Sequence, residues 1–276
     1  MIKRLYIEIT NICNLSCSFC KKNRRTPHFM STGEFEHILN ETADMTKYIY
    51  LHVQGEPLLH PDLMSFMQIA EAHGCQVQLV TNALLLNDHM DLLGCEVLRK
   101  ISFSLQSVEF HDRDIQAFMD PVISFIKTAS AQGRPYCELR FWRDDQMHLK
   151  RTEECLQRIM DEFHPSESGR KNNFRILPGV YVDHSNPFDW PDIENSKTDE
   201  TGTCLGGISQ LAILSDGTVV PCCLDADGEI ALGNIFTQSM KEILASPRYI
   251  ALTEGFRNHR LTEDLCRKCT FRHRFD

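Results

Sequence analysis

The sequence lacks the long apolar segments that mark membrane-spanning and exported proteins. No apolar run reaches the roughly 18 residues that a membrane-spanning helix needs. The first six residues, MIKRLY, contain neither an apolar stretch nor the small-residue cleavage site of a secretory signal. We therefore expect a cytoplasmic protein that has no membrane partner.

An excess of positive charge is also missing. Lys and Arg together number 29 against 38 Asp and Glu, so the formal net charge is -9. A surface of this sign repels the phosphate backbone, so nucleic acid is not an expected partner. The 276 residues show no internal repeat and no low-complexity tract. This length fits one large domain, or a main domain with a small appendage.

Cysteine, in contrast, is abundant, with 12 residues in a chain that shows no export signal. In a reducing cytosol, clustered cysteines are more often metal ligands or catalytic thiols than disulfide partners. The composition therefore excludes a secreted disulfide scaffold and points to metal or thiol chemistry.

Short β-rich runs alternate with helical patterns over the first part of the chain. The pattern predicts strands over residues 3–10, 48–53, 76–81, 100–105, 137–142 and 174–177. It predicts helices near 31–39 and over 62–72, 120–131 and 148–163. The third helix is expected to begin at Asp120-Pro121, because proline is favoured at the first helical position.

This alternation is typical of parallel strands joined by helical crossovers. Six units are too few for a closed eight-stranded barrel. The expected fold class is therefore α/β, a partial (β/α)6 barrel that binds its ligands at the carboxyl ends of the strands.

The alternation stops after Gly179. Residues 183–199 are polar and contain proline, which is typical of a loop. Residues 211–220 alternate around the hairpin signature Ser215-Asp216-Gly217-Thr218, and a short helix is predicted over 240–244. We expect a barrel over 1–180, a connecting loop over 181–203, and a small C-terminal β-hairpin/helix domain that binds a cluster over 204–276.

Three cysteines lie within eight residues after the first predicted strand: Cys13, Cys17 and Cys20. Three thiolates on a short loop can hold three irons of a cubane cluster and leave the fourth iron open to a small molecule. A zinc site is the alternative, although zinc ligands usually come in Cys-x2-Cys pairs with a closed fourth position.

This loop resembles that of the radical S-adenosylmethionine (SAM) superfamily, which has the same spacing and an aromatic residue before the last cysteine, here Phe19. The resemblance implies a [4Fe–4S] cluster whose open iron binds SAM and cleaves it to a 5′-deoxyadenosyl radical, which abstracts hydrogen from the substrate. Gly55-Glu56-Pro57 is similar to the family's Gly-Gly-Glu-Pro segment, which receives the amino group of SAM. Gln54 stands in place of the first glycine.

Polar residues end the third and fourth predicted strands, where the family places further contacts with SAM: Asn82, Ser104 and Gln106. A polar strand end that only faces solvent is the alternative for each. No protein side chain is expected to act catalytically beyond binding the cofactor.

A second group of thiols lies in the C-terminal part: Cys204, Cys222, Cys266 and Cys269. Their arrangement resembles the twitch domain, a shortened SPASM domain of some radical SAM enzymes, and implies an auxiliary [4Fe–4S] cluster. Structural zinc is the alternative, because both metals accept four thiolates. Cys223 is not expected to bind beside Cys222, since neighbouring side chains on extended backbone point in opposite directions.

Substrate contacts are expected from two places. Arg140 and Trp142 alternate on the fifth predicted strand and would share a face, which in a partial barrel is the lumen. An arginine there needs a partner, either a substrate or a structural acid. His184 and Asn186 lie in the predicted loop, where substrate contact and simple solvation are the alternatives.

Together these features predict a radical SAM oxidoreductase or lyase that acts on a small polar molecule and receives electrons from a flavodoxin or ferredoxin. The architecture is similar to that of aminocyclitol dehydrogenases of the 2-deoxy-scyllo-inosamine type, which implies net oxidation with the auxiliary cluster as electron acceptor.

Three alternatives stay open. The first is a radical lyase that acts on a modified nucleobase, of the queuine lyase type. The second is a peptide maturase, which is disfavoured because the first strand begins at residue 3 and leaves no room for an N-terminal peptide-recognition domain. The third, a non-enzymatic iron–sulfur or zinc-binding protein, is disfavoured by the Gly55-Glu56-Pro57 segment.

Overall fold

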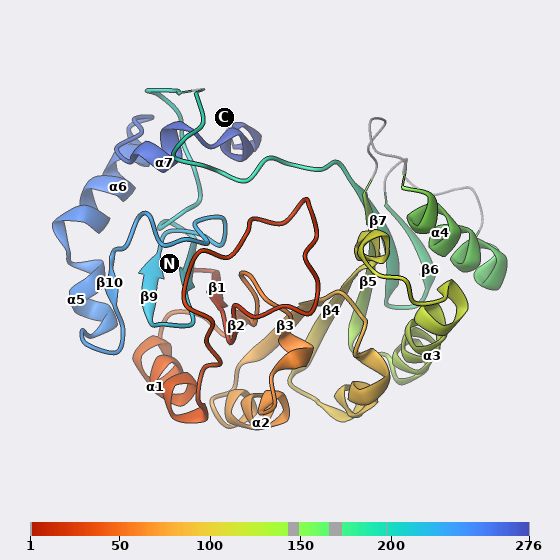
Figure 1. Cartoon of the computed structure of the whole chain (residues 1–276). Coiled ribbons are helices and arrows are strands. Elements are labelled where there is room, and N and C mark those ends of the chain that lie inside the picture. Colours follow the sequence, from red (N-terminus) through yellow and green to blue (C-terminus); the bar gives the residue numbers. More distant parts are fainter. Residues whose placement is uncertain (1, 143–148, 166–172, 197, 276) are drawn as a thin grey trace.

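The computed structural model describes residues 2–142, 149–165, 173–196 and 198–275. Within these residues, ten strands form one sheet in the order β10-β9-β8-β1-β2-β3-β4-β5-β7-β6. The sheet curves around a central space and does not close on itself (Figure 1).

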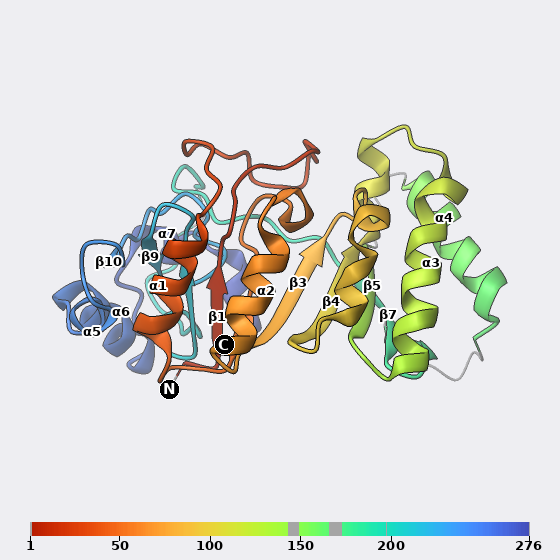
Figure 2. The same ribbon diagram turned by 90° about the horizontal axis from the view of Figure 1, so that it is seen from below.

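Six parallel strands form the middle of the sheet: β1 (Arg4–Ile7), β2 (Tyr48–Tyr50), β3 (Gln76–Thr81), β4 (Leu98–Ser104), β5 (Tyr136–Trp142) and β7 (Val180–Ser185). The expected α/β fold with a partial barrel is therefore confirmed. The long loop after β1 crosses the barrel on the side of the carboxyl ends of these strands (Figure 2).

Four helices cover the outer face of the parallel strands: α1 (Thr32–Thr42), α2 (Leu63–Ala72), α3 (Ile115–Gln132) and α4 (Lys150–Phe163). α1 begins with a capping box, in which Ser31 and Glu34 bind each other's backbone N–H groups. Phe66 of α2 and Phe103 of β4 are fully buried in the apolar layer between helices and sheet. The expected start of α4 at residue 148 lies outside the described residues.

Three 3-10 segments follow β2, β3 and β4, at the carboxyl ends of these strands: η1 (Pro57–Leu59), η2 (Leu86–Gly94) and η3 (Leu105–Phe110).

The prediction that a helix begins at Asp120-Pro121 is wrong. α3 begins at Ile115, and its cap is Asp114, whose carboxylate accepts two backbone N–H groups of the first turn at 3.0 Å. Pro121 lies inside the helix, where it removes one intrahelical hydrogen bond but does not end the helix.

The predicted sixth parallel strand is also misplaced. Residues 174–177 belong to β6 (Asn173–Leu177), which runs antiparallel to β7 at the outer edge of the sheet. Only two residues join β6 to β7, with Gly179 at φ 75, and this is too short for a parallel crossover. The sixth parallel strand is β7, which includes residues 183–185 of the predicted loop.

The C-terminal part extends the same sheet. β8 (Gln210–Ile213) pairs in parallel with β1, and β9 (Thr218–Val220) and β10 (Gly233–Asn234) follow antiparallel. The predicted hairpin is thus present as β8 and β9, but its attachment to β1 is not indicated by the sequence. Four short helical segments complete this part: α5 (Met240–Leu244), α6 (Pro247–Arg257), α7 (Asp264–Arg267) and η4 (Thr270–Arg274).

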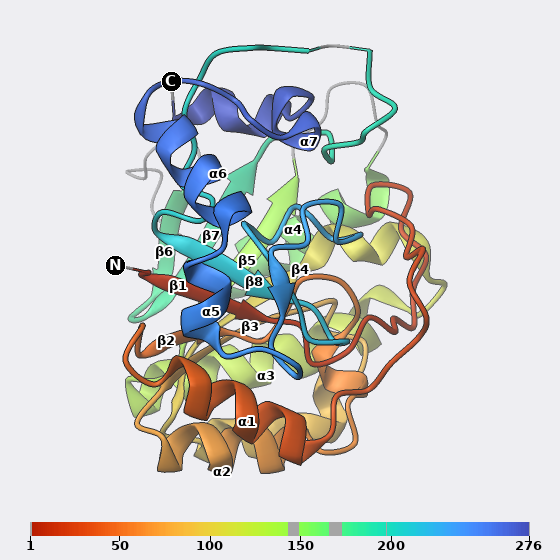
Figure 3. The ribbon, with the colours of Figure 1, turned by 90° about the vertical axis from the view of Figure 1, so that its left-hand side faces the viewer.

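The segment that follows β7 arcs across the open side of the barrel toward the C-terminal helices (Figure 3). The expected boundaries at residues 180 and 203 stay predictions. Among the described residues, no helix has the length and apolar character required to cross a membrane.

Candidate functional site

The loop after β1 carries its three cysteines over the barrel mouth. Cys17 and Cys20 share a thiol–thiol hydrogen bond, which lowers the pKa of the Cys20 thiol. The Cys13 sulfur accepts N–H groups from Leu15 at 3.4 Å and from the Asn82 side chain at 3.9 Å. The thiol–thiol hydrogen bond also raises the pKa of Cys17, and burial raises the pKa of Cys13, so Cys20 is the thiol of this loop whose metal-binding thiolate form is favoured.

Gly55 holds the segment after β2 against this loop. Its φ is 74°, and a Cβ atom there would lie 2.4 Å from the carbonyl oxygen of Thr10. The next residue, Glu56, donates its backbone N–H to Ile12 at 2.9 Å. Only glycine permits both this conformation and this close approach, so the local sequence fixes the position of Glu56 beside the cysteine loop.

Glu56 is buried, and its carboxylate accepts three hydrogen bonds. The donors are the Thr81 hydroxyl at 2.7 Å, the Asn82 backbone N–H at 2.7 Å and the Leu58 backbone N–H at 3.0 Å. Burial nevertheless raises the pKa of Glu56 to about 7. Through its hydrogen bonds, Glu56 therefore connects the ends of β2 and β3.

Asn82 joins this network to the cysteine loop. Its side chain donates to Asn14 at 2.7 Å, next to Cys13, and its Oδ1 accepts the Leu84 N–H at 3.0 Å. Gln106 lies in η3 and is 2% exposed, and its Oε1 has no hydrogen-bond partner among the described residues. Ser104 is half-buried at the end of β4. An unpartnered buried acceptor at this edge fits a ligand that donates hydroxyl groups, such as the ribose of SAM.

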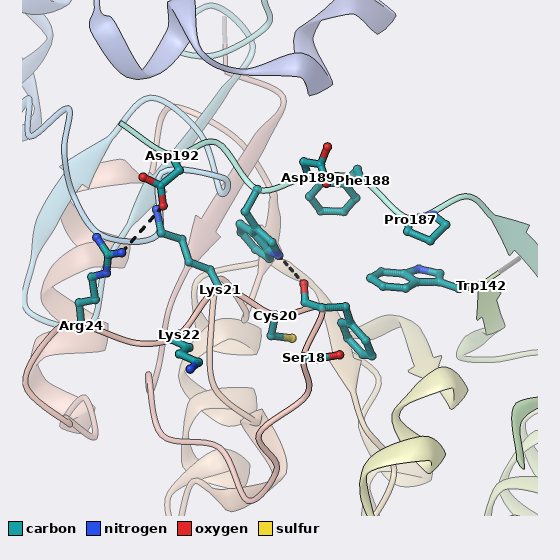
Figure 4. A pocket seen from close by; sticks show the side chains of 12 residues that line it. Ser18, Cys20, Lys21, Lys22, Arg24, Trp142, Pro187, Phe188, Asp189 and Asp192 are labelled. Carbon is teal, nitrogen blue, oxygen red and sulfur yellow. Dashed lines mark hydrogen bonds and ion pairs between the residues drawn. The ribbon is translucent and has the colours of Figure 1, made fainter. Parts of the chain in front are cut away.

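Figure 4 shows a pocket of about 560 Å³ that is lined by Trp142, Pro187 and Phe188 among others. Phe19 and Trp142 both line this pocket. Their ring centroids are 4.3 Å apart. Trp190, from the segment after β7, donates its indole N–H to the Phe19 carbonyl at 2.9 Å, and Phe188 packs beside it. The sequence pattern predicts substrate contacts from the loop that holds this Trp, but the hydrogen bond of Trp190 to Phe19 and the packing of Phe188 are not part of the prediction.

Arg140 and Trp142 belong to the same face of β5, together with Glu138. Glu138 accepts hydrogen bonds from Lys100 at 2.9 Å and Ser102 at 2.8 Å on the neighbouring strand β4. Arg140 has no ion pair within 4 Å among the described residues. Within the described residues, this face of the barrel therefore carries a cation without an ion-pair partner, near Glu138, whose pKa is lowered by Lys100 and also by Arg140.

His52, which follows β2, is a further polar residue at this site that the sequence-based prediction does not include. Its ring lies edge-on to Tyr6, with 5.5 Å between the centroids, and its Nδ1 has no partner among the described residues. Burial, with the charges of Arg140 and Lys100, lowers the pKa of His52 to about 3, so the ring is neutral. Its alternation with Tyr50 on the strand is the signal that could have identified it.

His184 and Asn186 are not part of this group. His184 belongs to β7 rather than to a loop, and it is in register with Phe141, between Arg140 and Trp142. Its ring therefore lies on the opposite face, beside Phe141 and Phe174 of the apolar layer. Asn186 is exposed.

The four C-terminal cysteines come together from three segments. Cys222 lies close to Cys204 and Cys266, and Cys269 lies close to the same two, as their mutual effects on the thiol pKa values show. Burial raises the pKa of all four thiols. Cys223 points elsewhere, because its sulfur shares a hydrogen bond with the Tyr6 hydroxyl on β1.

In the part of the chain that the structure describes, no three His, Cys, Asp or Glu side chains converge closely enough to hold a single metal ion. A four-iron cluster spreads its thiolates more widely than a single ion does, and a four-thiolate set is a ligand set that such clusters use. The two cysteine groups offer three thiols at Cys13, Cys17 and Cys20 and four in the C-terminal part, and [4Fe–4S] clusters use thiolate ligands.

Two family models match this chain. The model of the radical SAM superfamily matches residues 7–140. The model of the SPASM iron–sulfur cluster-binding domain matches residues 204–270.

Among curated proteins, a probable GTP 3′,8-cyclase of Methanopyrus kandleri is 30% identical over 48% of this chain and 45% of its own length. A GTP 3′,8-cyclase of Desulforamulus reducens is 23% identical over 80% of this chain and 81% of its own length. A mycofactocin maturase of Mycobacterium ulcerans is 32% identical over 29% of this chain and 22% of its own length. This chain thus spans less than half of the first and third of these relatives.

Among solved structures, BtrN in complex with AdoMet and 2-DOIA has a TM-score of 0.63 at 16% identity, over 98% of this chain and 93% of that one. SuiB of Streptococcus suis bound to the precursor peptide SuiA has a TM-score of 0.60 at 16% identity, over 98% of this chain and 70% of that one. At such identities the likeness shows the fold alone.

The radical SAM model covers the barrel and its cysteine loop, and the SPASM model covers the four C-terminal cysteines. The radical SAM domain implies a [4Fe–4S] cluster that binds SAM. The SPASM domain implies auxiliary iron–sulfur clusters. The chain therefore carries a radical SAM domain over residues 7–140 and a C-terminal SPASM-type cluster-binding domain over residues 204–270.

Proposed function

We propose that this enzyme oxidises a small polar molecule in the barrel lumen and that the auxiliary cluster takes up an electron from the substrate. The contact between Tyr6 and Cys223 carries this proposal. Tyr6 lies on the lumen side of β1, in a small cluster with Val220 of β9, and Cys223 is the chain neighbour of the auxiliary ligand Cys222. The auxiliary site thus adjoins the lumen, where an electron acceptor for a substrate has to be.

When bound, the open-iron cluster and SAM supply the 5′-deoxyadenosyl radical that removes a hydrogen atom from the substrate. Glu56 and Asn82 hold the cofactor segment against the cysteine loop, and Gln106 offers an acceptor for a hydroxyl group. Phe19 and Trp142 form an apolar wall that excludes water.

Recognition of the substrate is assigned to the polar side of the lumen. Arg140 supplies a cation without an ion-pair partner in the described part of the chain, and His52 supplies an unpartnered ring nitrogen. These groups suit a molecule rich in hydroxyl, amino or carboxylate groups. A flavodoxin or ferredoxin is the proposed electron donor for the first cluster.

A peptide substrate is the second candidate. It is favoured by the fold shared with SuiB bound to its precursor peptide and by the match to a mycofactocin maturase.

The first experiment tests the clusters and the cleavage of SAM. Anaerobic reconstitution is expected to give about eight irons per chain, as two [4Fe–4S] clusters require. Dithionite and SAM are expected to release 5′-deoxyadenosine, and Cys17→Ala is expected to abolish this release. About four irons with one zinc would contradict a redox role of the auxiliary site, and persistent cleavage in Cys17→Ala would contradict the cysteine assignment.

A second experiment separates the substrate classes. The reconstituted enzyme is incubated with SAM and a panel of polyols, amino sugars and short peptides, and each product is analysed by mass spectrometry. The proposal expects a loss of two hydrogens from a polyol or amino sugar, with one 5′-deoxyadenosine per product. Modification of peptides alone would favour the second candidate.

A further inference from the structure

Glu8, directly after β1, is a charged residue with 0% exposure. Its carboxylate oxygens lie 2.6 and 2.5 Å from Nη2 of Arg25, which stands at the far end of the cysteine loop. The Arg25 side chain is itself only 11% exposed. The two charges therefore form a buried ion pair that fixes both ends of the cysteine loop to each other.

The same pair reaches both cofactor regions. One oxygen of Glu8 accepts the backbone N–H of Gln54 at 3.2 Å, directly before Gly55. The other accepts the backbone N–H of Ser215 at 3.0 Å, in the turn between β8 and β9. Nε of Arg25 donates to the carbonyl of Ala226 at 2.8 Å. One ion pair thus contacts the cysteine loop, the Gly-Glu-Pro segment and the auxiliary domain.

A second buried pair repeats this connection. Lys21, next to Cys20, lies 2.8 Å from Asp227, and both side chains are less than one-tenth exposed. The Lys21 ammonium also donates to the backbone carbonyl of Pro191 at 3.1 Å. The backbone carbonyl of Lys21 accepts a hydrogen bond from the side-chain amide of Gln54 at 3.1 Å. The cysteine loop is therefore joined twice to the residues that follow Cys222 and Cys223.

Buried ion pairs of this kind are weak evidence for a purely stabilising role, because desolvation offsets most of the attraction. Such pairs hold segments in a defined register. If one partner moves away, the other is left as an unpaired buried charge, which costs free energy. The hydrogen bonds of Glu8 to the Gln54 and Ser215 N–H groups offer a direct route by which a displacement of the Gly-Glu-Pro segment would reach the β8–β9 turn. Coupling of this kind between two binding sites is reciprocal.

We propose that Glu8 and Arg25 are positioning residues that couple SAM binding at the cysteine loop to the order of the auxiliary-cluster domain. The inference rests on the cofactor site proposed above. It predicts that SAM, which binds at one end of the junction, protects the backbone of the β8–β9 turn and of residues 222–228, which lie at the other end.

Hydrogen-exchange mass spectrometry of the cluster-loaded full chain, with and without SAM, tests this coupling. In the wild type, SAM is expected to slow exchange over residues 52–58 and also over 213–228, the latter by about fivefold, at the low end of usual coupling strengths. In Glu8→Gln, protection of 52–58 is expected to persist, and protection of 213–228 to fall below about twofold.

Two further variants keep the test decisive. Asp227→Asn removes only the second pair, leaves Glu8 and Arg25 in place, and is expected to reduce the SAM effect on 213–228 by about half. Glu96→Gln breaks the exposed pair with Arg134 on the outer surface and is expected to behave as the wild type.

The outcomes are distinguishable. If SAM leaves residues 52–58 unprotected in the wild type, the cofactor site and the coupling are both overturned. If SAM protects 52–58 but not 213–228, or protects 213–228 equally in wild type and Glu8→Gln, the coupling alone is overturned.

Discussion

Cys222 and Cys223 are neighbours on the chain, but their thiols have different surroundings. Cys222 faces Cys204 and Cys266, whereas Cys223 is hydrogen-bonded to Tyr6 on the lumen side of β1. Because the Cys223 thiol is hydrogen-bonded to Tyr6, Cys222→Ala is expected to lose about four irons per chain and Cys223→Ala almost none, as measured by iron analysis after reconstitution. Equal iron loss in the two variants would show that Cys223 is a ligand.

Glu56 gives the protein a pH dependence whose sign follows from burial. Burial raises the pKa of Glu56 from 4.5 to about 7. Between these values the folded protein keeps a proton that the unfolded chain has lost. The free energy of unfolding therefore falls as the pH rises from 4.5 to 7, by about 3 kcal/mol in all, and stays level above pH 7.

Chemical unfolding of the cluster-free protein at several pH values checks this expectation. Glu56→Gln is expected to remove this pH dependence, so that the free energy of unfolding of the variant relative to the wild type rises by about 3 kcal/mol between pH 4.5 and 7. If the free energy of unfolding changed with pH equally in both proteins, the Glu56 carboxyl would not retain its proton between pH 4.5 and 7.

At the residue scale, the sequence indicates the side chains whose chemistry depends on local spacing. Cys13, Cys17 and Cys20 are predictable because their ligand geometry is contained in one loop. Glu8 and Arg25 are not predictable as a pair, because 17 positions separate them and nothing in their neighbours shows that both become buried. Such partners depend on how distant segments meet, which spacing does not encode.

At the scale of single elements, the turn after β2 depends on how closely two backbones approach. Gly55 and Gly74 both have positive φ values, 74° and 64°, but only Gly55 would bring a Cβ atom against another backbone. Gly74→Ala is therefore expected to cost about 1 kcal/mol of stability through the left-handed conformation alone. Gly55→Ala adds the contact with Thr10 and is expected to displace Glu56.

The affinity for SAM measures this displacement. Gly55→Ala is expected to weaken SAM binding by about tenfold or more, since small displacements of binding groups have large effects, whereas Gly74→Ala serves as the matched control with unchanged affinity. Equal affinities in the two variants would show that the close approach of Gly55 to the cysteine loop does not position the SAM site.

Elements are predictable from the sequence where local signals agree and are misjudged where they compete. The capping box at Ser31 and the hairpin at Gly217 combine several signals, and the structure has a helix and a hairpin at these places. At α3, the favoured first-turn proline at Pro121 competes with the cap at Asp114, and the two N–H groups bound by Asp114 decide the outcome. β7 is a strand because it pairs with β5 on one side and with β6 on the other, and the pairing with β5 is a tertiary contact.

For the whole molecule, the C-terminal part shares one sheet and one apolar core with the barrel. β8 completes the sheet beside β1, and Leu211, Ile213 and Val219 are fully buried in the same core as the barrel helices. Burial of three such side chains contributes about 5 to 9 kcal/mol. This is comparable with the whole stability of a typical domain, about 5 to 15 kcal/mol.

A chain that ends at residue 203 is therefore not expected to fold as an independent barrel. It would leave β1 as an open edge strand, which favours aggregation, and would remove Ser215 and Ala226 from the buried pair of Glu8 and Arg25. Size-exclusion chromatography is expected to show aggregates. The double variant Cys266→Ala/Cys269→Ala, which loses auxiliary ligands but keeps β8, is expected to stay soluble with native circular dichroism. A soluble truncated chain that binds SAM as tightly as the full protein would show that the barrel does not need β8.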